Sequence, residues 1–523
     1  MLFLLKRKIM RLIGLMKPVP QCFYEFAKLN SPWWKDIEPV DKSNGSVLYV
    51  DRMPFPLAMV VTMPVVKKIA DEQNKRVIIG LPYVHNNKQT KMMYSSYGVD
   101  DYITIDNAPW YIWVYFAYNA LKIIYTRDSV NKLLSLSYKG VKFGEELYDA
   151  IIRNTNSLYT LNELKLKYLP IITSAYVNIY NADKFFSREH NILVYGDCDY
   201  EMQGWPKMAI NYNKKCFQVN YSGVINHQEK KENKVFNCGK LSKEIYEESL
   251  KKITPQKLEQ FLQNHFCGSS ENCLDRYAYY GKNKYTLEKL YDVLNVVDRN
   301  KKNVLIAAHA FSDTPHYAYN LIFRDYFTWL FETIKILQAN DKINIFVKEH
   351  PTAYYYGETG SVAYYVKKYN MSNIYVLPQD FNTISVFSIM DAVVTCQGTI
   401  GLEATIYGIP VFTAGQGYYY GFGIDNNSKT LEEYTYKMLH ITEYPKPTEL
   451  QMQTAKNVLY LTGKKDEVKR EIREIEDLDV KMNWQRPDVL VAQCQEINKK
   501  LMKGVSPKEG YENLLDNVKI MHD

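Results

Sequence analysis

The sequence lacks several features that mark common protein classes. Its 523 residues include eight cysteines but no C-x-x-C pair, which excludes a zinc ribbon and a thioredoxin-type motif. No window holds 18 uncharged apolar residues, which excludes a membrane-spanning helix. The net charge is only +7, from 65 basic and 58 acidic side chains, so we expect no nucleic-acid partner. Scattered cysteines fit a reducing compartment, so we expect a cytoplasmic protein.

The first 17 residues alternate between apolar and basic side chains. They begin like a signal peptide, but four cations interrupt the apolar stretch, and no small-residue cleavage site follows. Two interpretations stay open for residues 1–20. The segment is either a basic amphipathic helix on an anionic membrane surface or an ordinary packed terminal helix. The four cations are Lys6, Arg7, Lys8 and Arg11.

Short apolar runs alternate with helix-like segments along the chain. In the second half these runs are rich in Val and Ile and almost continuously apolar, which is typical of parallel strands covered on both faces. Repeated strand–helix–strand order indicates a doubly wound α/β sheet. The runs lie at residues 46–52, 75–83, 191–197, 215–223, 303–311, 343–351, 373–380, 391–399 and 409–415.

The two groups of runs predict an α/β protein with two Rossmann-like domains that face a central cleft. Ligands of such sheets bind beyond the carboxyl ends of the strands, so the candidate sites lie there. The expected parts are a basic segment at 1–20, an N-terminal Rossmann-like domain at 21–240, a helical connector at 241–300, a C-terminal Rossmann-like domain at 301–480 and C-terminal helices at 481–523.

Polar side chains follow four of the predicted strands in the second half. Period-two alternation puts Lys348 and His350 on the same side of their strand, where they could neutralise a phosphate. The alternative is a surface lysine and a loop histidine with ordinary hydrogen bonds. The polar residues at the four strand ends are His309, Ser312, His316, Lys348, His350, Gln379, Gln397, Gly398 and Thr399.

The segment DAVVTCQGTIGLEATIYG (391–408) predicts a strand, a glycine-containing turn and a helix. A helix N-terminus can hold phosphate, and Gly398 and Gly401 would let the backbone approach the anion closely. Thr399 is placed to cap the helix. Glu403 lies one turn further, where it could accept hydrogen bonds from ribose hydroxyls. Its alternative role is a favourable negative charge near the helix start.

Several of these motifs together resemble a known family. The run from NVLIAAHAFSDTPH through KEHP to QGTIGLEATIYGIPVFTAG, followed by YYYGFGI and LEEYTY, resembles the capsule polysaccharide and surface-carbohydrate biosynthesis glycosyltransferases, which include Kdo transferases. The similarity is specific over about 300–440. GEELYDAIIR (144–153) and GDCDYEMQGWPKMAI (196–210) look like acceptor-side segments of that family.

The resemblance implies a GT-B-type glycosyltransferase. The nucleotide-sugar donor, CMP-Kdo or another CMP- or UDP-linked sugar, would bind the C-terminal domain. A bacterial capsule, surface polysaccharide or glycolipid acceptor would bind the N-terminal domain. No cofactor is expected, and His309 and His350 become catalytic candidates. Residues 1–20 then become a candidate for peripheral contact with the inner membrane.

Three alternatives stay open. A sugar-nucleotide 2-epimerase shares the architecture, but its acidic-Gly-Gly signature is missing where this chain has QGTIGLEA. A polyol-phosphate transferase would also use histidine and a helix N-terminus against phosphate. The third is a non-catalytic polysaccharide-assembly scaffold.

A D-x-D motif, Asp197-Cys198-Asp199, starts at the last residue of the run at 191–197, and Glu201 follows it. In single-sheet glycosyltransferases this motif holds a metal, but here it lies in the predicted acceptor domain. We therefore expect no metal, and predict Asp199 as the base on an acceptor hydroxyl or the nucleophile on the anomeric carbon. The alternative is a pair of helix-capping aspartates. The following Gly204 and Trp205 are suited to close approach and sugar stacking.

Overall fold

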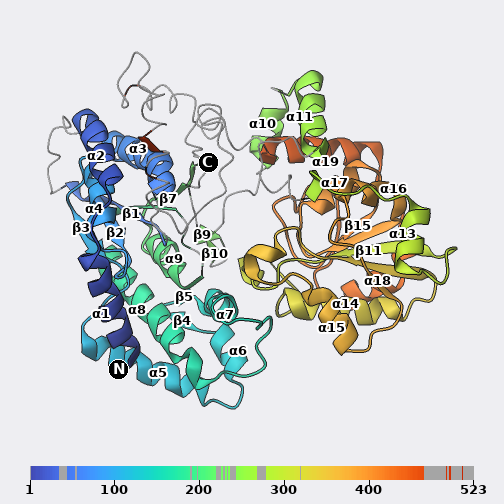
Figure 1. Ribbon diagram of the computed structural model, residues 1–523, viewed down its shortest axis with the longest axis horizontal. Helices are drawn as coiled ribbons and strands as arrows, with labels where there is room; N and C mark the ends of the chain where they lie inside the picture. Colours follow the sequence, from blue (N-terminus) through green and yellow to red (C-terminus); the bar gives the residue numbers. More distant parts are fainter. Residues whose placement is uncertain are drawn as a thin grey trace. The chain divides into compact units, whose positions relative to one another are not determined.

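The chain folds into two compact units (Figure 1). The first comprises residues 1–150, 163–238 and 465–523, and the second comprises 151–162 and 239–464. The expected boundaries differ, since they put 151–162 in the N-terminal domain and treated 241–300 as a connector. The computed structural model describes residues 2–34, 44–52, 56–188, 191–196, 198, 200–219, 225–227, 230–231, 234–235, 243–251, 253–267, 278–317, 320–463, 491, 494–495 and 509. Most of the predicted C-terminal helices at 481–523 lie outside these residues.

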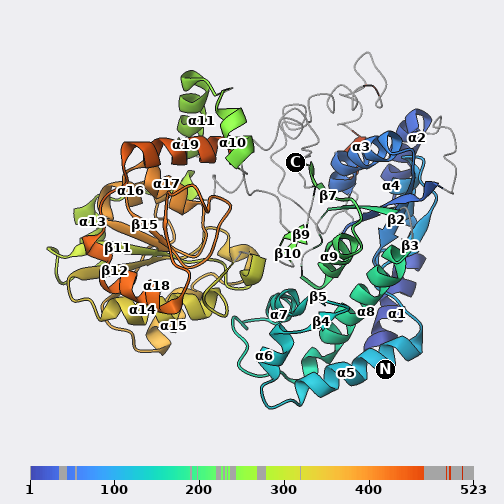
Figure 2. The same ribbon diagram turned by 180° about the vertical axis from the view of Figure 1, so that it is seen from behind.

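A six-stranded sheet with the order β3-β2-β1-β6-β7-β8 forms the centre of the first unit (Figure 2). All neighbours are parallel except β7 and β8. This is the Rossmann order, with the reversal between β1 and β6. The strands are β1 Ser46–Val50, β2 Arg76–Leu81, β3 Tyr102–Thr104, β6 Asn191–Tyr195, β7 Cys216–Val219 and β8 Ile225–His227.

Helices and two short hairpins complete the first unit. The helices are α1 Leu2–Met16, α2 Gln21–Trp34, α3 Pro56–Glu72, α4 Lys88–Ser95, α5 Trp110–Ile124, α6 Ser129–Leu134, α7 Gly144–Arg153, α8 Leu169–Phe186 and α9 Gly204–Asn211, with the 3₁₀ turns η2 Leu166–Tyr168 and η3 Tyr200–Met202. The last residues of α7 are assigned to the second unit. The hairpins are β4 Ser137–Tyr138 with β5 Val141–Lys142, and β9 Lys230–Lys231 with β10 Lys234–Val235.

The second unit repeats the same design. Its sheet is parallel throughout, with the order β13-β12-β11-β14-β15-β16. The strands are β11 Lys302–Ala307, β12 Ile343–Lys348, β13 Ile374–Val376, β14 Ala392–Thr395, β15 Val411–Thr413 and β16 Asn426–Asn427. The helices are α10 Lys243–Leu250, α11 Pro255–Cys267, α13 Leu287–Leu294, α14 Tyr326–Gln338, α15 Ser361–Lys368, α16 Val386–Ile389, α17 Ile400–Ile406, α18 Leu431–Leu439 and α19 Glu449–Gly463, with the 3₁₀ turns η4 Pro315–Tyr317, η5 Ala353–Tyr356, η6 Thr383–Ser385 and η7 Ile441–Glu443.

The second sheet is buried on both faces. Val304 and Ile306 of β11 pack into one apolar cluster, whereas Leu305 between them packs into another. Phe346 of β12 and Val393 of β14 lie in the same cluster as Leu305. This alternation explains why the strands read as continuous apolar runs, since each face meets its own layer of helices.

All nine predicted strands are present, and the fold class of two Rossmann-like α/β domains is confirmed. Helices that the sequence placed in a connector belong instead to the core of the second unit. Leu258, Leu262 and Phe266 of α11 pack in one cluster with Leu402 and Ile406 of α17. Helix α17, which follows β14, is therefore supported by α11, a helix from the segment that was expected to be a connector. The central cleft stays a prediction.

Candidate functional site

The strand order of the second sheet reverses between β11 and β14, the place where ligands of such sheets bind. His309 lies just after β11, and its ring contacts the turn after β14. Its Nε2 lies 3.3 Å from Thr395 Oγ1 and accepts a hydrogen bond from the Gln397 amide at 3.4 Å. His309 therefore joins the two strand ends that border the switch point.

An aromatic stack holds His309 in place. Its ring lies against the ring of Tyr326, with 4.3 Å between centroids and 18° between planes. The side-chain amide of Gln397 donates to the Tyr326 hydroxyl. The ring of His350 lies nearly parallel to that of His309, with centroids 6.2 Å apart. The structure thus brings together His309, His350 and Gln397, as the sequence predicted from three different strand ends.

The hydrogen bonds of the two histidines fix their neutral tautomers. The His350 Nδ1 accepts from the Thr352 amide at 3.3 Å and lies 2.7 Å from the Thr352 hydroxyl. Its ring proton is therefore on Nε2. For His309 the accepting atom is Nε2, which places the proton on Nδ1.

Both histidines are neutral at physiological pH. Burial, assisted by the nearby His350, lowers the pKa of His309 to about 3. Burial and the neighbouring Lys348 lower the pKa of His350 to about 4. In the free protein these rings can offer hydrogen bonds to a ligand but no positive charge, so the expectation that His350 neutralises phosphate needs this correction.

Lys348 is the last residue of β12, and only 6% of its surface is exposed. Burial and the positive charge of Lys282 lower its pKa to about 7, and the Glu403 carboxylate acts in the opposite direction. No residue in the described part of the chain forms a hydrogen bond with its ammonium group. A buried amine without such a partner is the group best suited to receive an anion here.

Lys282 was missed by the sequence analysis. It comes from the predicted connector and donates through Nζ to the carbonyl of Gln379 at 3.1 Å. Its charge acts on Lys348, so it belongs to the same edge of the sheet. The exposed Gln379 reaches this edge through its backbone, in the loop after β13.

Glu403 of α17 is buried and has a partner that sequence reasoning missed. Its Oε1 lies 2.8 Å from Nε2 of His265, on α11. Phe261, Phe266 and Tyr279 surround the His265 ring. Oε1 of Glu403 is thus bound to His265 inside the second unit. Only Oε2 is left for the predicted contact with ribose. The sequence separation of 138 residues gave no signal for this pair.

Two predictions for the turn before α17 are wrong in their physical reason. The side chain of Thr399 does not cap the helix and instead accepts from the Tyr418 hydroxyl at 3.2 Å. Gly401 is buried, and a Cβ there would lie 2.3 Å from the Tyr419 hydroxyl. Gly401 therefore allows close packing of Tyr419, not close approach of a phosphate. Gly398 is partly exposed beside His309 and remains a candidate for the residue that lets a phosphate approach the backbone closely.

Ser312 does not join the cluster in the way predicted. The Ser312 hydroxyl and amide both donate to Glu358, which also accepts from the Phe311 amide at 2.6 Å. Ser312 thus anchors the loop after β11 and has its hydroxyl occupied. His316 lies on η4 and is partly exposed.

Replacing Gly401 with alanine should lower the stability of the second unit by about 1–3 kcal/mol, because the new methyl group overlaps the Tyr419 hydroxyl. That hydroxyl donates to the Gly398 carbonyl at 3.0 Å, so the bond would be lost as well. Urea denaturation measures the effect. The double variant with Tyr419→Phe should recover part of the loss. A Gly401→Ala protein as stable as the parent would contradict this packing role.

In the first unit the reversal between β1 and β6 brings another polar edge together. The Gly196 amide donates to the Val50 carbonyl at 2.9 Å. A Cβ on Gly196 would lie 2.4 Å from Oδ2 of Asp51, a buried carboxylate that accepts from the Tyr49 hydroxyl at 3.0 Å. Asp51 was missed as a site residue, although it directly follows a predicted strand. The predicted Asp197 and Asp199 come next in the chain and lie outside the described residues.

Glu201 lies at this edge on η3. Its Oε1 is 4.0 Å from Nε of Arg52, and its buried Oε2 has no hydrogen-bond partner among the described residues. The guanidinium of Arg52 also lies 4.6 Å from the ring centre of Tyr200. Tyr200 has φ of +57°, a strained conformation for a residue with a side chain. The backbone directly after Asp199 is therefore held in an unusual turn.

The two acceptor-like segments meet in the first unit. Lys207 of α9 forms a buried ion pair with Glu146 of α7 and donates to the Lys142 carbonyl at 3.0 Å. Trp205, however, is 1% exposed and packs edge-on against Phe186, with centroids 6.0 Å apart. The prediction that it stacks on a sugar is wrong, because the ring belongs to the core.

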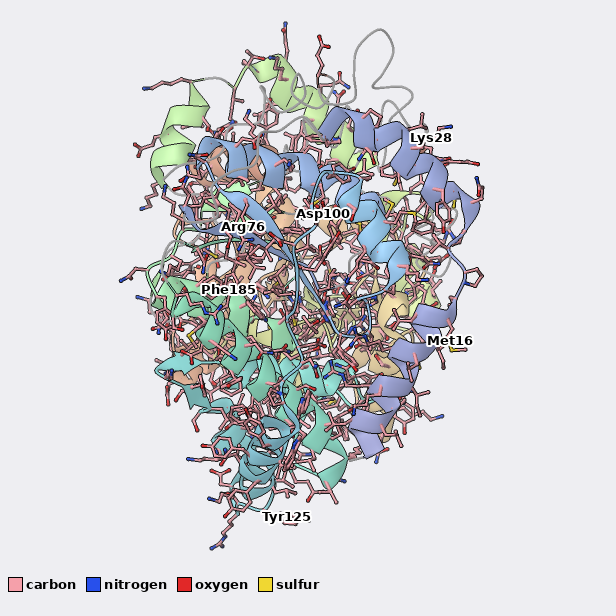
Figure 3. All side chains as sticks on the ribbon, turned by 90° about the vertical axis from the view of Figure 1, so that its left-hand side faces the viewer. Met16, Lys28, Arg76, Asp100, Tyr125 and Phe185 are labelled. Carbon is pink, nitrogen blue, oxygen red and sulfur yellow. The ribbon has the colours of Figure 1, made fainter. Side chains whose placement is uncertain are left out.

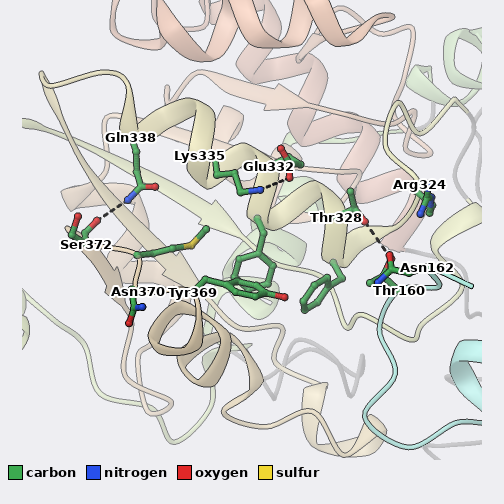
Figure 4. A pocket seen from close by; sticks show the side chains of 13 residues that line it. Thr160, Asn162, Arg324, Thr328, Glu332, Lys335, Gln338, Tyr369, Asn370 and Ser372 are labelled. Atoms are coloured by element: carbon green, nitrogen blue, oxygen red, sulfur yellow. Dashed lines mark hydrogen bonds and ion pairs between the residues drawn. The ribbon is translucent and has the colours of Figure 1, made fainter.

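Other features within the described residues offer less. They contain no group of three or more His, Cys, Asp or Glu side chains that could hold a metal ion, and no helix long and apolar enough to cross a membrane. A pocket lies along α14 in the second unit (Figure 4), lined by Phe327, Lys335 and Met371 among others. None of its lining residues belongs to the strand-end cluster, so it is separate from the candidate site.

One comparison with known proteins agrees with the resemblance seen in the sequence. Residues 228–455 match the family model described as capsule polysaccharide biosynthesis protein. The match to this capsule polysaccharide family includes every member of the strand-end cluster and nearly all of the second unit. The resemblance is confirmed for this part of the chain. A search of curated proteins gives no match.

Solved structures give only remote similarity. A KpsC beta Kdo 2,4 transferase from Thermosulfurimonas dismutans is 14% identical over 50% of this chain and 78% of its own, with a TM-score of 0.29. A UDP-GlcNAc 2-epimerase from Neisseria meningitidis, bound to UDP-GlcNAc, is 10% identical over 82% and 98%, with a TM-score of 0.25.

Proposed function

We propose that this protein is a glycosyltransferase that moves a sugar from a nucleotide-activated donor to a growing bacterial capsule or surface polysaccharide or glycolipid. One observation carries the proposal. A buried lysine and two neutral histidines gather at the switch point of a Rossmann-like sheet, in the part of the chain that matches the capsule polysaccharide family.

The second unit would bind the donor. Lys348 has no hydrogen-bond partner in the described part of the chain and is the natural receptor for a phosphate group. His350 Nε2 can donate a hydrogen bond to the same anion, and the partly exposed Gly398 lets the ligand approach the turn. As the bond to the sugar breaks, negative charge grows on the phosphate oxygen. A fixed cation and fixed donors stabilise that charge more than they stabilise the ground state.

The first unit would bind the acceptor and supply the base. We place Asp199 in that role, with Asp197 and Glu201 secondary, because they follow β6 at the edge where Gly196 and Asp51 meet. A general base must lie within hydrogen-bond reach of the acceptor hydroxyl. The proposal therefore includes a central cleft in which the two edges face each other.

We propose CMP-Kdo or another CMP- or UDP-linked sugar as donor, on the strength of the motifs at 300–440. The protein would work in the cytoplasm, with peripheral contact of residues 1–20 to the inner membrane. The location and the membrane contact are independent of the reaction class.

Nucleotide release from CMP-, UDP-, GDP- and CDP-linked substrates tests the reaction class. A glycosyltransferase releases nucleotide at a rate that depends on acceptor. A 2-epimerase converts the donor without acceptor, a polyol-phosphate transferase releases nucleotide only from a polyol-linked substrate, and a scaffold does neither. Conversion of a donor that is unaffected by acceptor would refute the proposal.

A further inference from the structure

The first unit exposes an apolar and aromatic surface on α1 and α5, which we call the α1–α5 face. Figure 3 looks onto this unit and labels Met16, at the end of α1, and Tyr125, directly after α5. Each side chain of the face has between 46% and 81% of its surface exposed. They are Leu5, Ile9, Met10, Leu12, Ile13 and Met16 from α1, and Trp110, Tyr111, Val114, Tyr115, Tyr118 and Tyr125 from α5 and its end.

The packing of α5 explains why its aromatic side faces outward. Its inner side is fixed to α8, where Phe116 stacks on Tyr176 with centroids 5.1 Å apart and planes 7° apart. Ala120 and Ile123 continue this buried side. The aromatic residues on the other side of the helix, Trp110, Tyr111, Tyr115 and Tyr118, are therefore left exposed. Exposed apolar side chains gathered on the outer side of a helix mark an interaction surface.

The two arginines of α1 attach it beside the start of α5. Arg7 donates to the carboxylate of Asp106 at 2.5 Å and to its carbonyl at 3.0 Å, and its guanidinium lies 5.2 Å from the ring centre of Trp113. Arg11 lies 4.5 Å from the ring centre of Tyr83. The interpretation of α1 as a basic helix on a membrane therefore does not hold for these two cations. They turn inward, and the apolar side of α1 turns outward.

The charged side chains of α1 and α5 are all basic, and the exposed Asp128 lies beyond the end of α5. Neither α1 nor α5 contains an Asp or Glu. Exposed cations border the apolar side chains, and such a pattern complements an anionic surface. Tyrosine and tryptophan suit the boundary between lipid and water, because an apolar ring carries one polar atom. The exposed cations are Lys6, Lys8, Lys17, Lys122 and Arg127.

We propose that the α1–α5 face binds the surface of an anionic lipid bilayer, with α1 in the interface plane and the aromatic side chains of α5 at headgroup level. The inference rests on the proposed membrane contact of residues 1–20 and extends it to a second helix. It places most of the insertion on aromatic residues outside the N-terminal segment. It does not depend on the glycosyltransferase reaction.

Vesicle flotation tests the proposal, using phosphatidylcholine alone and phosphatidylcholine mixed with phosphatidylglycerol. We expect the parent to float with the anionic vesicles. The triple variant Trp110→Ser, Tyr111→Ser and Tyr115→Ser should bind them about ten-fold or more weakly, because it removes the aromatic anchors. A matched control replaces three exposed tyrosines of the second unit, Tyr354, Tyr355 and Tyr364, with serine and should bind like the parent.

Point variants are needed on α1 as well, because deletion of residues 1–17 would leave the partly buried Asp106 without Arg7. Leu12→Gln with Met16→Gln should weaken vesicle binding while the protein keeps its melting temperature, since both side chains are exposed. Transfer to a soluble acceptor should be unchanged in every variant, which separates this proposal from the proposed reaction.

Three results would overturn the proposal. The first is a parent protein that does not bind anionic vesicles. The second is an α5 triple variant that binds them as strongly as the parent does. The third is a parent dimer that the triple variant dissociates, with no vesicle binding by either protein. That outcome would assign the face to a second copy of the chain.

Discussion

Replacement of Lys348 with methionine should abolish most nucleotide binding and yet leave the second unit as stable as before, or more stable. Binding should weaken at least ten-fold, because a charge-assisted hydrogen bond to phosphate is lost. Stability should not fall, because only 6% of the Lys348 surface is exposed and none of the described residues forms a hydrogen bond with its ammonium group, so methionine removes a cost of burial. Calorimetric titration with nucleotide and urea denaturation measure the two effects.

The same lysine should make nucleotide affinity depend on pH. Its pKa is about 7 in the free protein, so above pH 7 the amine is mostly neutral and binding of an anion must take up a proton. Affinity should therefore decrease as pH rises from 7 to about 9, by up to about ten-fold per pH unit. The Lys348→Met variant should lack this slope. As a control, Lys335→Met, whose exposed partner is Glu332, should bind like the parent. If the Lys348→Met variant bound nucleotide like the parent and with the same pH dependence, the donor site would not be at Lys348.

Replacement of Asp199 with asparagine should leave donor binding intact and lower transfer by at least about 10²-fold, the lower end for loss of a general base. The carboxamide keeps the size of the side chain but cannot take a proton from an acceptor hydroxyl. Glu201→Gln should cost less, since the Glu201 carboxylate lies 4.0 Å from Arg52 and serves partly as its counter-ion. Turnover and donor titration separate the two effects.

Chelation supplies the contrast for Asp199. The parent should stay active in EDTA, because the proposed role of the D-x-D motif is proton transfer and not metal binding. An enzyme inactivated by EDTA, together with loss of donor binding in Asp199→Asn, would make the motif a metal site.

The strands of both sheets were predictable, because each buried parallel strand leaves a continuous apolar run. The missed strands β3, β8 and β16 have only two or three residues and lie toward the sheet edges, where little apolar sequence is needed. The polar residues after β11, β12 and β14 were predictable for the same reason, since the end of a run marks the end of a strand. Their gathering follows from the parallel order.

The partners of those residues were not predictable. The role of Gly401 depends on Tyr419, and that of Glu403 on His265, a residue 138 positions away that faces it only after α11 packs on α17. Trp205 illustrates the same limit, because a tryptophan in a glycine-containing loop suits sugar stacking as well as burial. Only the packing of α9 against Phe186 decides between them.

The mass of the acceptor glycan after incubation with donor tests the central claim most directly. Oligosaccharide fragments of the surface polysaccharide from the source cells serve as acceptor, and mass spectrometry follows them. If the protein is a glycosyltransferase, the acceptor should gain the mass of one sugar residue for each nucleotide released. Asp199→Asn and Lys348→Met should both abolish this gain in mass. Conversion of the donor with no change in acceptor mass would contradict the account.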